Sequence, residues 1–278
     1  MRRIATITGP DGKVTTVVTR SSRCGCLTVL AAVTASHVRS VLRSALSDAE
    51  KWGEVSRNVA KLTKPPKVEP YHVEPMKPDQ ALAILDAVAD TDLEAPVSVA
   101  LWTGLRQGEL LALQWSDVDL SAHRLSVSAT LQRRGREWYI EAAKTAKSRR
   151  TIGLPSPAVD TLTAWRQRQL EQRLRVGPRW TTRWGDFVFT DPIGQPVMAA
   201  TLTHNFRSTQ ERAGLQPVRF HDLRHAAATL MLASGTDLKV VSEVLGHSTI
   251  ATTANVYAGV LDSLKDDAAD RLTRLLAR

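Results

Sequence analysis

The sequence predicts a mainly α fold with a small antiparallel β-sheet (an α+β class). Apolar residues recur at helical spacing over most of the chain, and one stretch in its middle reads as a series of short strands. A proline-rich linker at residues 63–76 separates a short N-terminal part from the rest. With 278 residues, the chain can form one main domain and a smaller one.

The N-terminal part divides into two segments. Residues 1–36 are atypical, and the alternation in IATITGPDGKVTTVVT around a Pro-Asp-Gly turn predicts a small β-hairpin. Residues 37–62 predict helices, because apolar residues recur at helical spacing from Val38 to Trp52 and Gly53 follows where a helix would stop. A second short helix is expected over residues 54–62.

Residues 77–262 predict the larger, mostly helical domain. Helices are expected over residues 79–89 and 94–102, and GELLALQW continues the helical pattern. Three strands with a turn between each are expected in RLSVSATLQRR, EWYIEAA and RRTIGLP. Ser156 and Pro157 then open an amphipathic helix, with Ser156 as its cap. The segment DFVFTDPIGQPV predicts a further strand and turn, and helices follow to the end of the chain.

Residues 263–278 predict a helical tail with one apolar face. In VLDSLKDDAADRLTRLLAR, five apolar residues fall on one helical stripe, namely Leu261, Leu264, Ala268, Leu272 and Leu275. Such a stripe covers either its own domain or a neighbouring copy of the chain.

The composition favours a basic protein of a reducing compartment. The net charge is +9 and the isoelectric point about 9.9, and most of the 37 basic residues are arginines, which pair bidentately with phosphate. This points to a nucleic acid partner, although a merely soluble basic surface fits the charge equally well. Cys24 and Cys26 are too close for an easy disulfide and lack zinc-finger spacing. The apolar run LTVLAAV is too short to span a bilayer.

Five short motifs carry candidate chemistry. They are TGLRQGELLALQWSDVDL with Arg106, EAAKTAKSRRTIGLP with Lys144, FHDLRH with His221 and Arg224, LGHS with His247, and VY with Tyr257. Each has a simpler explanation when taken alone. Arginine at a helix start is usually solvated, the run from Lys144 to Arg150 resembles a solvated hairpin, and His221 and His225 fit ordinary helix histidines. His247 could bond a backbone carbonyl after Gly246, and Tyr257 could fill a gap between helices.

Taken together, the motifs fit the transfer of a phosphodiester to a tyrosine. Two guanidinium groups can hold the equatorial oxygens of a five-coordinate phosphorus, and concentrated positive charge with a nearby base helps a tyrosine to ionise. The departing sugar oxygen needs a proton, which a lysine on a hairpin could supply. Without paired carboxylates a two-metal nuclease is disfavoured, and without a Gly-rich phosphate loop so is a nucleotide hydrolase.

The motifs resemble those of the tyrosine recombinases, specifically the phage-type integrases. TGLRQGELLALQW, the KT of a basic hairpin, HDLRH, LGHS and the late VY stand in that family's order and at similar spacing across roughly residues 75–262. The resemblance implies the tyrosine recombinase catalytic-domain fold and a site-specific DNA recombinase. Such an enzyme cuts and rejoins DNA through a 3′-phosphotyrosine intermediate and needs no cofactor, because the protein–DNA phosphate bond stores the energy of the bond broken.

The resemblance also assigns roles to the candidate residues. Arg106 and Arg224 would clamp the scissile phosphate, and Lys144 would be the general acid. Lys147 is the alternative acid, because a short shift in the hairpin would exchange the two lysines; the Lys-Thr pattern favours Lys144.

Three further roles are implied by the same motifs. His221 would assist proton transfer and His247 would bond a phosphate oxygen. Tyr257 would be the nucleophile. Glu109, three residues after Arg106, resembles a family position that supports the pocket from behind.

The implied partners are double-stranded DNA at attachment-type sites and other copies of the chain. Members of the family usually act as tetramers on DNA and pass a C-terminal tail to a neighbour, and a directionality factor is possible. No membrane partner is expected, and the implied location is the cytoplasm of a prokaryotic host, in association with the nucleoid.

The N-terminal part departs from the family pattern. Only residues 37–62 resemble part of a helical core-binding domain, and residues 1–20 faintly resemble the start of an arm-binding domain. The departure predicts a chain that has lost a middle piece, such as a prophage remnant, or one with a misplaced start. Three functions therefore remain open: an active recombinase, a DNA-binding module without turnover, and a type IB topoisomerase-like enzyme. The last is disfavoured, since the local strings match integrases better.

Overall fold

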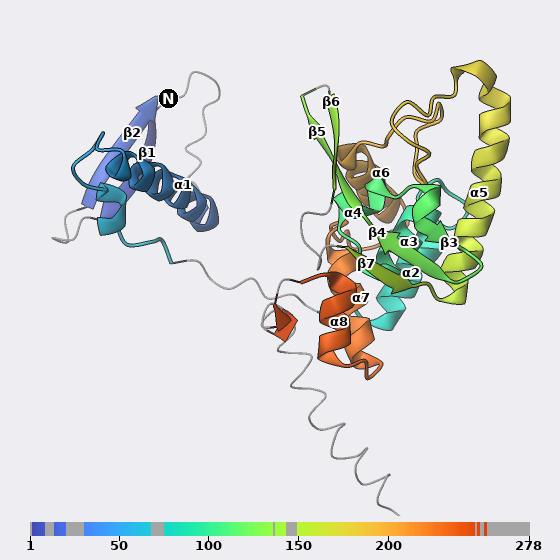
Figure 1. Cartoon of the computed structure of the whole chain (residues 1–278). Helices are drawn as coiled ribbons and strands as arrows, with labels where there is room; N and C mark the ends of the chain where they lie inside the picture. The colour runs from blue at the N-terminus through green and yellow to red at the C-terminus, as the bar shows by residue number, and fades with distance from the viewer. Residues whose placement is uncertain are drawn as a thin grey trace, which may run out of the picture. The chain divides into compact units, whose positions relative to one another are not determined.

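A computed structural model of the chain describes residues 2–8, 14–20, 31–67, 75–135, 137–142, 149–247, 249–250 and 253–254. The chain divides into two units, Met1–His72 and Val73–Arg278, each of which is described by itself (Figure 1). Within the described ranges, no helix combines the length and the apolar character needed to cross a membrane.

The first unit contains the expected hairpin. Strands β1 (Arg2–Thr8) and β2 (Val14–Arg20) pair in antiparallel fashion along their whole length. The Pro-Asp-Gly turn itself lies outside the described residues. Helix α1 (Ala32–Lys51) begins ahead of the expected start at His37. The short helix expected over 54–62 is only a 3-10 turn, η1 (Val59–Leu62).

Polar contacts hold η1 against α1. The side chain of Asn58 is buried, and its Nδ2 donates to the carbonyl oxygen of Arg43 and to Oγ of Ser47, both at 2.8 Å. Its Oδ1 accepts from the backbone N–H of Ala60 at 3.1 Å, which caps the turn. Helix α1 has no buried residue of its own. A polar side chain rather than an apolar core therefore fixes the chain after α1.

The second unit is mainly helical with small antiparallel sheets, which confirms the predicted fold class. Its helices are α2 (Pro78–Val88), α3 (Glu94–Thr103), α4 (Gln107–Ala112), α5 (Ser156–Val176), α6 (Ala199–Arg212), α7 (Asp222–Ala233) and α8 (Leu238–Leu245). The 3-10 turns η2 (Trp115–Asp117) and η3 (Gly177–Arg179) lie between them.

The second unit contains two small antiparallel sheets. Strands β3 (Val118–Asp119), β4 (Arg124–Val127) and β7 (Arg150–Gly153) form an antiparallel sheet in the order β3-β4-β7. Strands β5 (Ala129–Arg134) and β6 (Glu137–Ala142) form a separate hairpin that projects from the unit (Figure 1). The single strand expected in RLSVSATLQRR is thus divided at Ser128 between two sheets.

Two local predictions are wrong, namely the strand expected in DFVFTDPIGQPV and the cap expected at Ser156, whereas the turn expected in DFVFTDPIGQPV is present. DFVFTDPIGQPV forms no strand and contributes only the isolated bridges Gln114–Phe187 and Thr190–Pro196. The side chain of Asp191 closes a turn there by accepting from the backbone N–H groups of Ile193 and Gln195, and proline cannot donate to a ladder.

The second wrong prediction concerns the start of α5. Its N-cap is Pro155, so Ser156 is the first helical residue rather than the cap, and Ser156 makes no side-chain cap.

Helix α3 forms the centre of the second unit. Eight of its residues are buried, namely Ala95, Pro96, Val97, Ser98, Val99, Ala100, Leu101 and Thr103. It ends at Gly104, whose φ of 63° lies in the left-handed region. A Cβ at Gly104 would lie 2.5 Å from Cδ2 of Leu245 and 3.3 Å from Cβ of Ala227. Glycine is therefore needed where α3, α7 and α8 meet.

Replacing Gly104 by Ala should destabilise the protein more than the same change at Gly214. Both glycines have positive φ, 63° and 71°, but a Cβ at Gly214 would meet no atom within 4 Å. The left-handed backbone costs about 1–2 kcal/mol at either position, and crowding at Gly104 adds about 1–3 kcal/mol. Denaturant unfolding of the two variants measures the difference, and equal losses would contradict the close approach of α8 to Gly104.

Candidate active site

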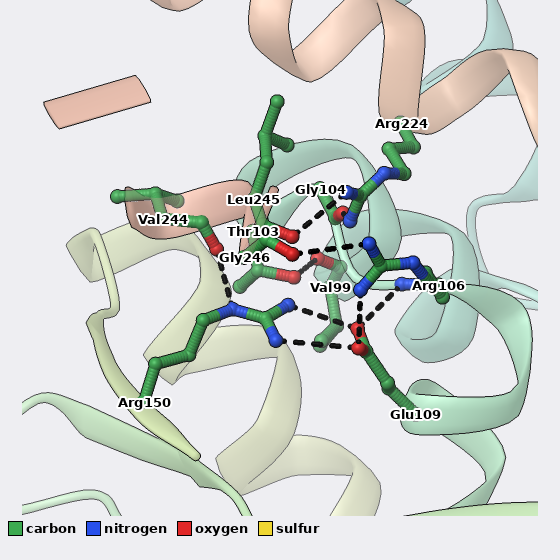
Figure 2. A network of polar contacts seen from close by, with 10 residues as sticks. All are labelled: Val99, Thr103, Gly104, Arg106, Glu109, Arg150, Arg224, Val244, Leu245 and Gly246. Carbon is green, nitrogen blue, oxygen red and sulfur yellow. Dashed lines mark hydrogen bonds and ion pairs between the residues drawn. The ribbon is translucent and has the colours of Figure 1, made fainter. Parts of the chain in front are cut away.

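Three arginines converge on the C-terminal end of α8 (Figure 2). The carbonyl oxygens of Val244, Leu245 and Gly246 accept hydrogen bonds in turn. Nε of Arg150 donates to Val244 at 2.6 Å, Nη2 of Arg224 to Leu245 at 2.7 Å, and Nη2 of Arg106 to Gly246 at 3.1 Å. Three consecutive carbonyls thus bind three guanidinium groups from separate parts of the chain.

The end of a helix is suited to this role. The last carbonyls of an α-helix have no partner inside the helix, and they carry the negative end of its dipole. Gly246 ends α8 in the left-handed conformation, with a φ of 65°. A Cβ there would lie 2.8 Å from Nη1 of Arg150, so the absence of a side chain lets the guanidinium approach the backbone.

Arg106 and Glu109 are positioned by the turn between α3 and α4. Arg106 is the N-cap of α4, and its backbone N–H donates to Oε2 of Glu109 at 2.9 Å. Its Nη1 also donates to Oε1 of the same carboxylate at 2.8 Å. The side chain of Arg106 remains 44% exposed, whereas that of Glu109 is 9% exposed. Arg106 is thus solvated in part, as expected for an arginine at a helix start, but hydrogen bonds from its backbone and side chain also hold it in place.

Arg224 lies in the first turn of α7 and is buried. Its Nη1 donates to the carbonyl oxygen of Gly104 at 2.6 Å, in addition to the bond with Leu245. The guanidinium therefore joins the ends of α3 and α8, and these contacts fix its plane.

Arg150 is also part of this network, although it was expected to belong to a solvated run. Its side chain is only 8% exposed, and Nη2 donates to Oε2 of Glu109 at 2.8 Å and Nη1 to Oε1 at 3.2 Å. Burial raises the pKa of Glu109, but the hydrogen bonds and charge of Arg150, with the hydrogen bonds of Arg106, outweigh it and hold the pKa below its usual value. The neighbouring Arg149 is exposed, as expected.

His221 and His225 lie together at the start of α7. His221 is the N-cap residue, and its ring meets that of His225 edge to face at 5.1 Å between centroids. Burial and the charge of Arg224 lower the pKa of His221, while Asp222 acts in the opposite sense. Burial and His221 lower the pKa of His225. Both rings are therefore neutral at pH 7 and can accept a proton.

His247 directly follows the left-handed Gly246. Its Nδ1 lies 2.7 Å from Oγ1 of Thr253, a buried hydroxyl, rather than bonding a backbone carbonyl as the simple reading suggested. Burial, followed by the charges of Arg224 and Arg106, lowers the pKa of His247 to about 4. A neutral imidazole thus lies in the field of the arginines, with Nδ1 engaged by Thr253.

The structure brings together five of the predicted site residues. Arg106, Glu109 and Arg224 share the network at α8, and the charges of both arginines act on His221 and His247. Lys144, the alternative Lys147 and Tyr257 lie outside the described residues, as does the C-terminal tail.

The sequence reading assigned no role to Arg150 or Thr253. The burial of Arg150 could have been predicted from the alternation of β7. Arg150 and Ile152 are two residues apart, so their side chains lie on the same face of the strand, and that of Ile152 is buried.

The site can bind an anion. Three guanidinium charges against the single carboxylate of Glu109 leave an excess of two positive charges, and the surrounding histidines are neutral. Guanidinium groups bind phosphate oxygens in a planar, bidentate manner. Within the part of the chain that the structure describes, no group of three His, Cys, Asp or Glu residues is arranged to hold a metal ion.

Comparison with known proteins gives one family. Residues 74–263 match the model of the phage integrase family. A tyrosine recombinase XerC-like protein of Caldanaerobacter subterraneus subsp. tengcongensis is 34% identical over 213 residues, which cover 73% of this chain and 54% of that protein. The chain spans 54%, 66% and 58% of the length of three of the curated relatives that it matches.

Solved structures show the same fold. The Tn1549 transposon integrase in complex with transposon right end DNA is similar with a TM-score of 0.65 and 23% identity, over 87% of this chain and 78% of that chain. A lambda integrase tetramer bound to a Holliday junction is similar with a TM-score of 0.54 and 23% identity, over 78% and 59% of the two chains.

The site predicts a pH dependence of stability. Because the folded pKa of His247 is about 4 and that of an unfolded histidine about 6.5, the unfolded chain binds more protons between these values. The free energy of unfolding should therefore fall as the pH is lowered from about 6.5 to about 4. His221 and His225 act in the same direction. His247→Asn should reduce the loss by about 1 kcal/mol, after allowing for screening by solvent.

Denaturant unfolding at a series of pH values measures this effect. In the His247→Asn variant, the free energy of unfolding should still fall with decreasing pH, but less steeply, because His221 and His225 remain. An identical pH profile for the variant and the wild type would show that His247 does not titrate in the arginine field.

Proposed function

Since the chain belongs to the phage integrase family, we propose that it breaks and rejoins DNA strands at specific sites through a covalent 3′-phosphotyrosine intermediate. The observation that carries the proposal is the convergence of Arg106, Arg224 and His247 around the end of α8. In the sequence, Tyr257 follows His247 by only a short segment.

Double-stranded DNA is the proposed substrate. The net charge of +9 favours a polyanion, and the similar Tn1549 integrase is bound to DNA. The projecting β5–β6 hairpin adds exposed charge, with the guanidinium of Arg134 stacked 5.2 Å from the ring of Tyr139 and that of Arg133 5.4 Å from Trp138. Arg134 is also ion-paired with Glu141 at 2.6 Å, so part of its charge is offset within the hairpin.

The arginines supply electrostatic stabilisation of the transition state. A phosphodiester under attack develops charge on its equatorial oxygens, and donors fixed in advance stabilise this charge without reorganisation. Arg224 is fixed by the carbonyls of Gly104 and Leu245, and Arg106 by Glu109 and Gly246. With Nδ1 of His247 bound to the hydroxyl of Thr253, the opposite ring nitrogen is assigned to a phosphate oxygen.

The proposed reaction exchanges one phosphate ester for another. The hydroxyl oxygen of Tyr257 forms a bond to the scissile phosphorus while the bond to the 5′ oxygen breaks. Neutral His221 assists removal of the tyrosine proton, and Lys144 gives a proton to the departing 5′ oxygen. Attack by another 5′ hydroxyl reverses these steps and rejoins the strands. The energy of the broken ester remains in the phosphotyrosine, so the cycle needs no cofactor.

Tyr139 is poorly suited to be the nucleophile. Its hydroxyl donates to Oε2 of Glu137 at 2.7 Å, and this bond raises its pKa. A tyrosine nucleophile requires the opposite shift, toward the ionised form. This contrast supports the assignment to Tyr257, which follows the arginine-bound end of α8 in the chain.

The proposed active form is a homo-tetramer on DNA. The lambda integrase of similar fold is a tetramer on a Holliday junction. The apolar stripe from Leu261 to Leu275 is then a surface for a neighbouring copy, which would link assembly to activity.

Tyr257→Phe should abolish covalent attachment to DNA and strand exchange while leaving DNA affinity nearly unchanged. The substitution removes only the attacking oxygen. Purified protein is incubated with fragmented host DNA and denatured, and the DNA that remains linked to protein is recovered and sequenced. Wild type should give adducts at a few discrete sites that are absent in the variant.

The same experiment separates the alternatives. Adducts that persist in Tyr257→Phe would refute this nucleophile. Relaxation of supercoiled DNA without site preference would indicate a topoisomerase-like enzyme, and DNA binding without any adduct would indicate a binding module.

Lys144→Ala should slow adduct formation by about 10²–10⁴-fold, because the leaving 5′ oxygen then lacks its proton donor. A DNA substrate with sulfur in place of that 5′ oxygen should restore most of the rate, since a thiolate leaves without a proton. Lys147→Ala is the matched control, and it should have a small effect that sulfur does not change. If sulfur rescued Lys147→Ala instead, Lys147 would be the general acid.

A further inference from the structure

Arg150 connects three elements of the second unit through its side chain. It lies at the start of β7, where it pairs with Val127 of β4. From this strand its guanidinium reaches both carboxylate oxygens of Glu109 and the carbonyl oxygen of Val244 (Figure 2). A single side chain thus joins the β3-β4-β7 sheet, the first turn of α4 and the last turn of α8.

We propose that Arg150 is a positioning residue for the strand-breaking reaction, which sets Arg106 and His247 through Glu109 and the end of α8. This inference rests on the proposed function. Arg150 acts through other groups: Glu109 holds the backbone and Nη1 of Arg106, and the end of α8 leads directly to His247.

The geometry requires a guanidinium rather than any positive charge. The two Nη atoms bind the two oxygens of Glu109, and Nε binds Val244, so three acceptors lie around the edge of one planar group. A lysine ammonium is a compact charge at the end of a flexible chain and cannot hold this set. Gly246 completes the fit, because a Cβ there would lie 2.8 Å from Nη1 of Arg150.

Burial separates Arg150 from its neighbour. The side chain of Arg150 is 8% exposed, and Arg149 is exposed. Removal of a partner from a buried ion pair is costly, whereas an exposed arginine contributes little. Arg149 therefore provides a control of the same type one residue away, and Arg→Lys at both positions keeps the net charge constant.

The first measurement is amide hydrogen exchange of the DNA-free protein. The backbone N–H of Gly246 donates to the carbonyl oxygen of Glu243, and that of His247 to Ser242, each at 3.0 Å. In Arg150→Lys these two amides should exchange about 10-fold faster or more, while Arg149→Lys should match wild type. Unchanged exchange in Arg150→Lys would overturn the proposal, and this result does not depend on enzymatic activity.

The second measurement is single-turnover adduct formation. Arg150→Lys should lower the rate about 10²-fold through misplacement of the phosphate-binding groups, with DNA affinity unchanged because the charge is kept. Sulfur at the 5′ position should not rescue this loss, in contrast to Lys144→Ala. A wild-type rate, or rescue by sulfur, would overturn the proposal, the latter because Arg150 would then act through the lysine.

The outcomes also separate the inference from the proposed function. If wild type forms no adduct at all, the proposed function fails and hydrogen exchange alone decides the role of Arg150 in the geometry of the site. If Arg150→Lys does not fold, Arg150→Gln is measured in the same way. Failure of both variants to fold at any temperature would make the role purely structural and refute positioning.

Discussion

Hydrogen bonds from three arginines to the last carbonyls of α8 are the contact on which the rest of the site depends. Arg150, Arg224 and Arg106 come from β7, α7 and the turn before α4, and each binds one carbonyl of the run 244–246. The strand β7, the helix α7 and the turn before α4 are therefore all joined to the C-terminal end of α8. The helix end supplies acceptors that have no partner within the helix, and the arginines supply charge that a phosphate can share.

These hydrogen bonds explain the backbone conformation of two nearby glycines and the protonation states of His247 and Glu109. Gly104 and Gly246 both adopt positive φ, and at both positions a side chain would collide with a neighbouring element. Burial, reinforced by the clustered charge of the arginines, lowers the pKa of His247 to about 4 and keeps its ring neutral at pH 7. Glu109 remains ionised because of the arginines and fixes them in return. Anion binding and a neutral hydrogen-bonding histidine thus follow from one arrangement.

Elements that depend on local patterns were predicted from the sequence, whereas features that depend on tertiary contacts were not. Helical periodicity predicted α3, and the Pro-Asp-Gly hairpin was found from alternation. The split at Ser128 was missed because it depends on which sheet each half joins. The order of motifs predicted Arg106 and Arg224, but their distances to α8 could not be read from spacing. Arg150 was overlooked since a run of basic residues suggested a solvated hairpin, although strand parity with Ile152 placed it on the buried face.

In the proposed reaction, this arginine-bound helix end prepares a phosphate for attack by the tyrosine that follows it in the chain. The most direct test is mass spectrometry of the protein–DNA adduct after digestion with protease and nuclease. We expect a nucleotide attached through its 3′ phosphate to the peptide that contains Tyr257. Attachment to Tyr71, to Tyr139 or to a residue other than tyrosine would contradict it.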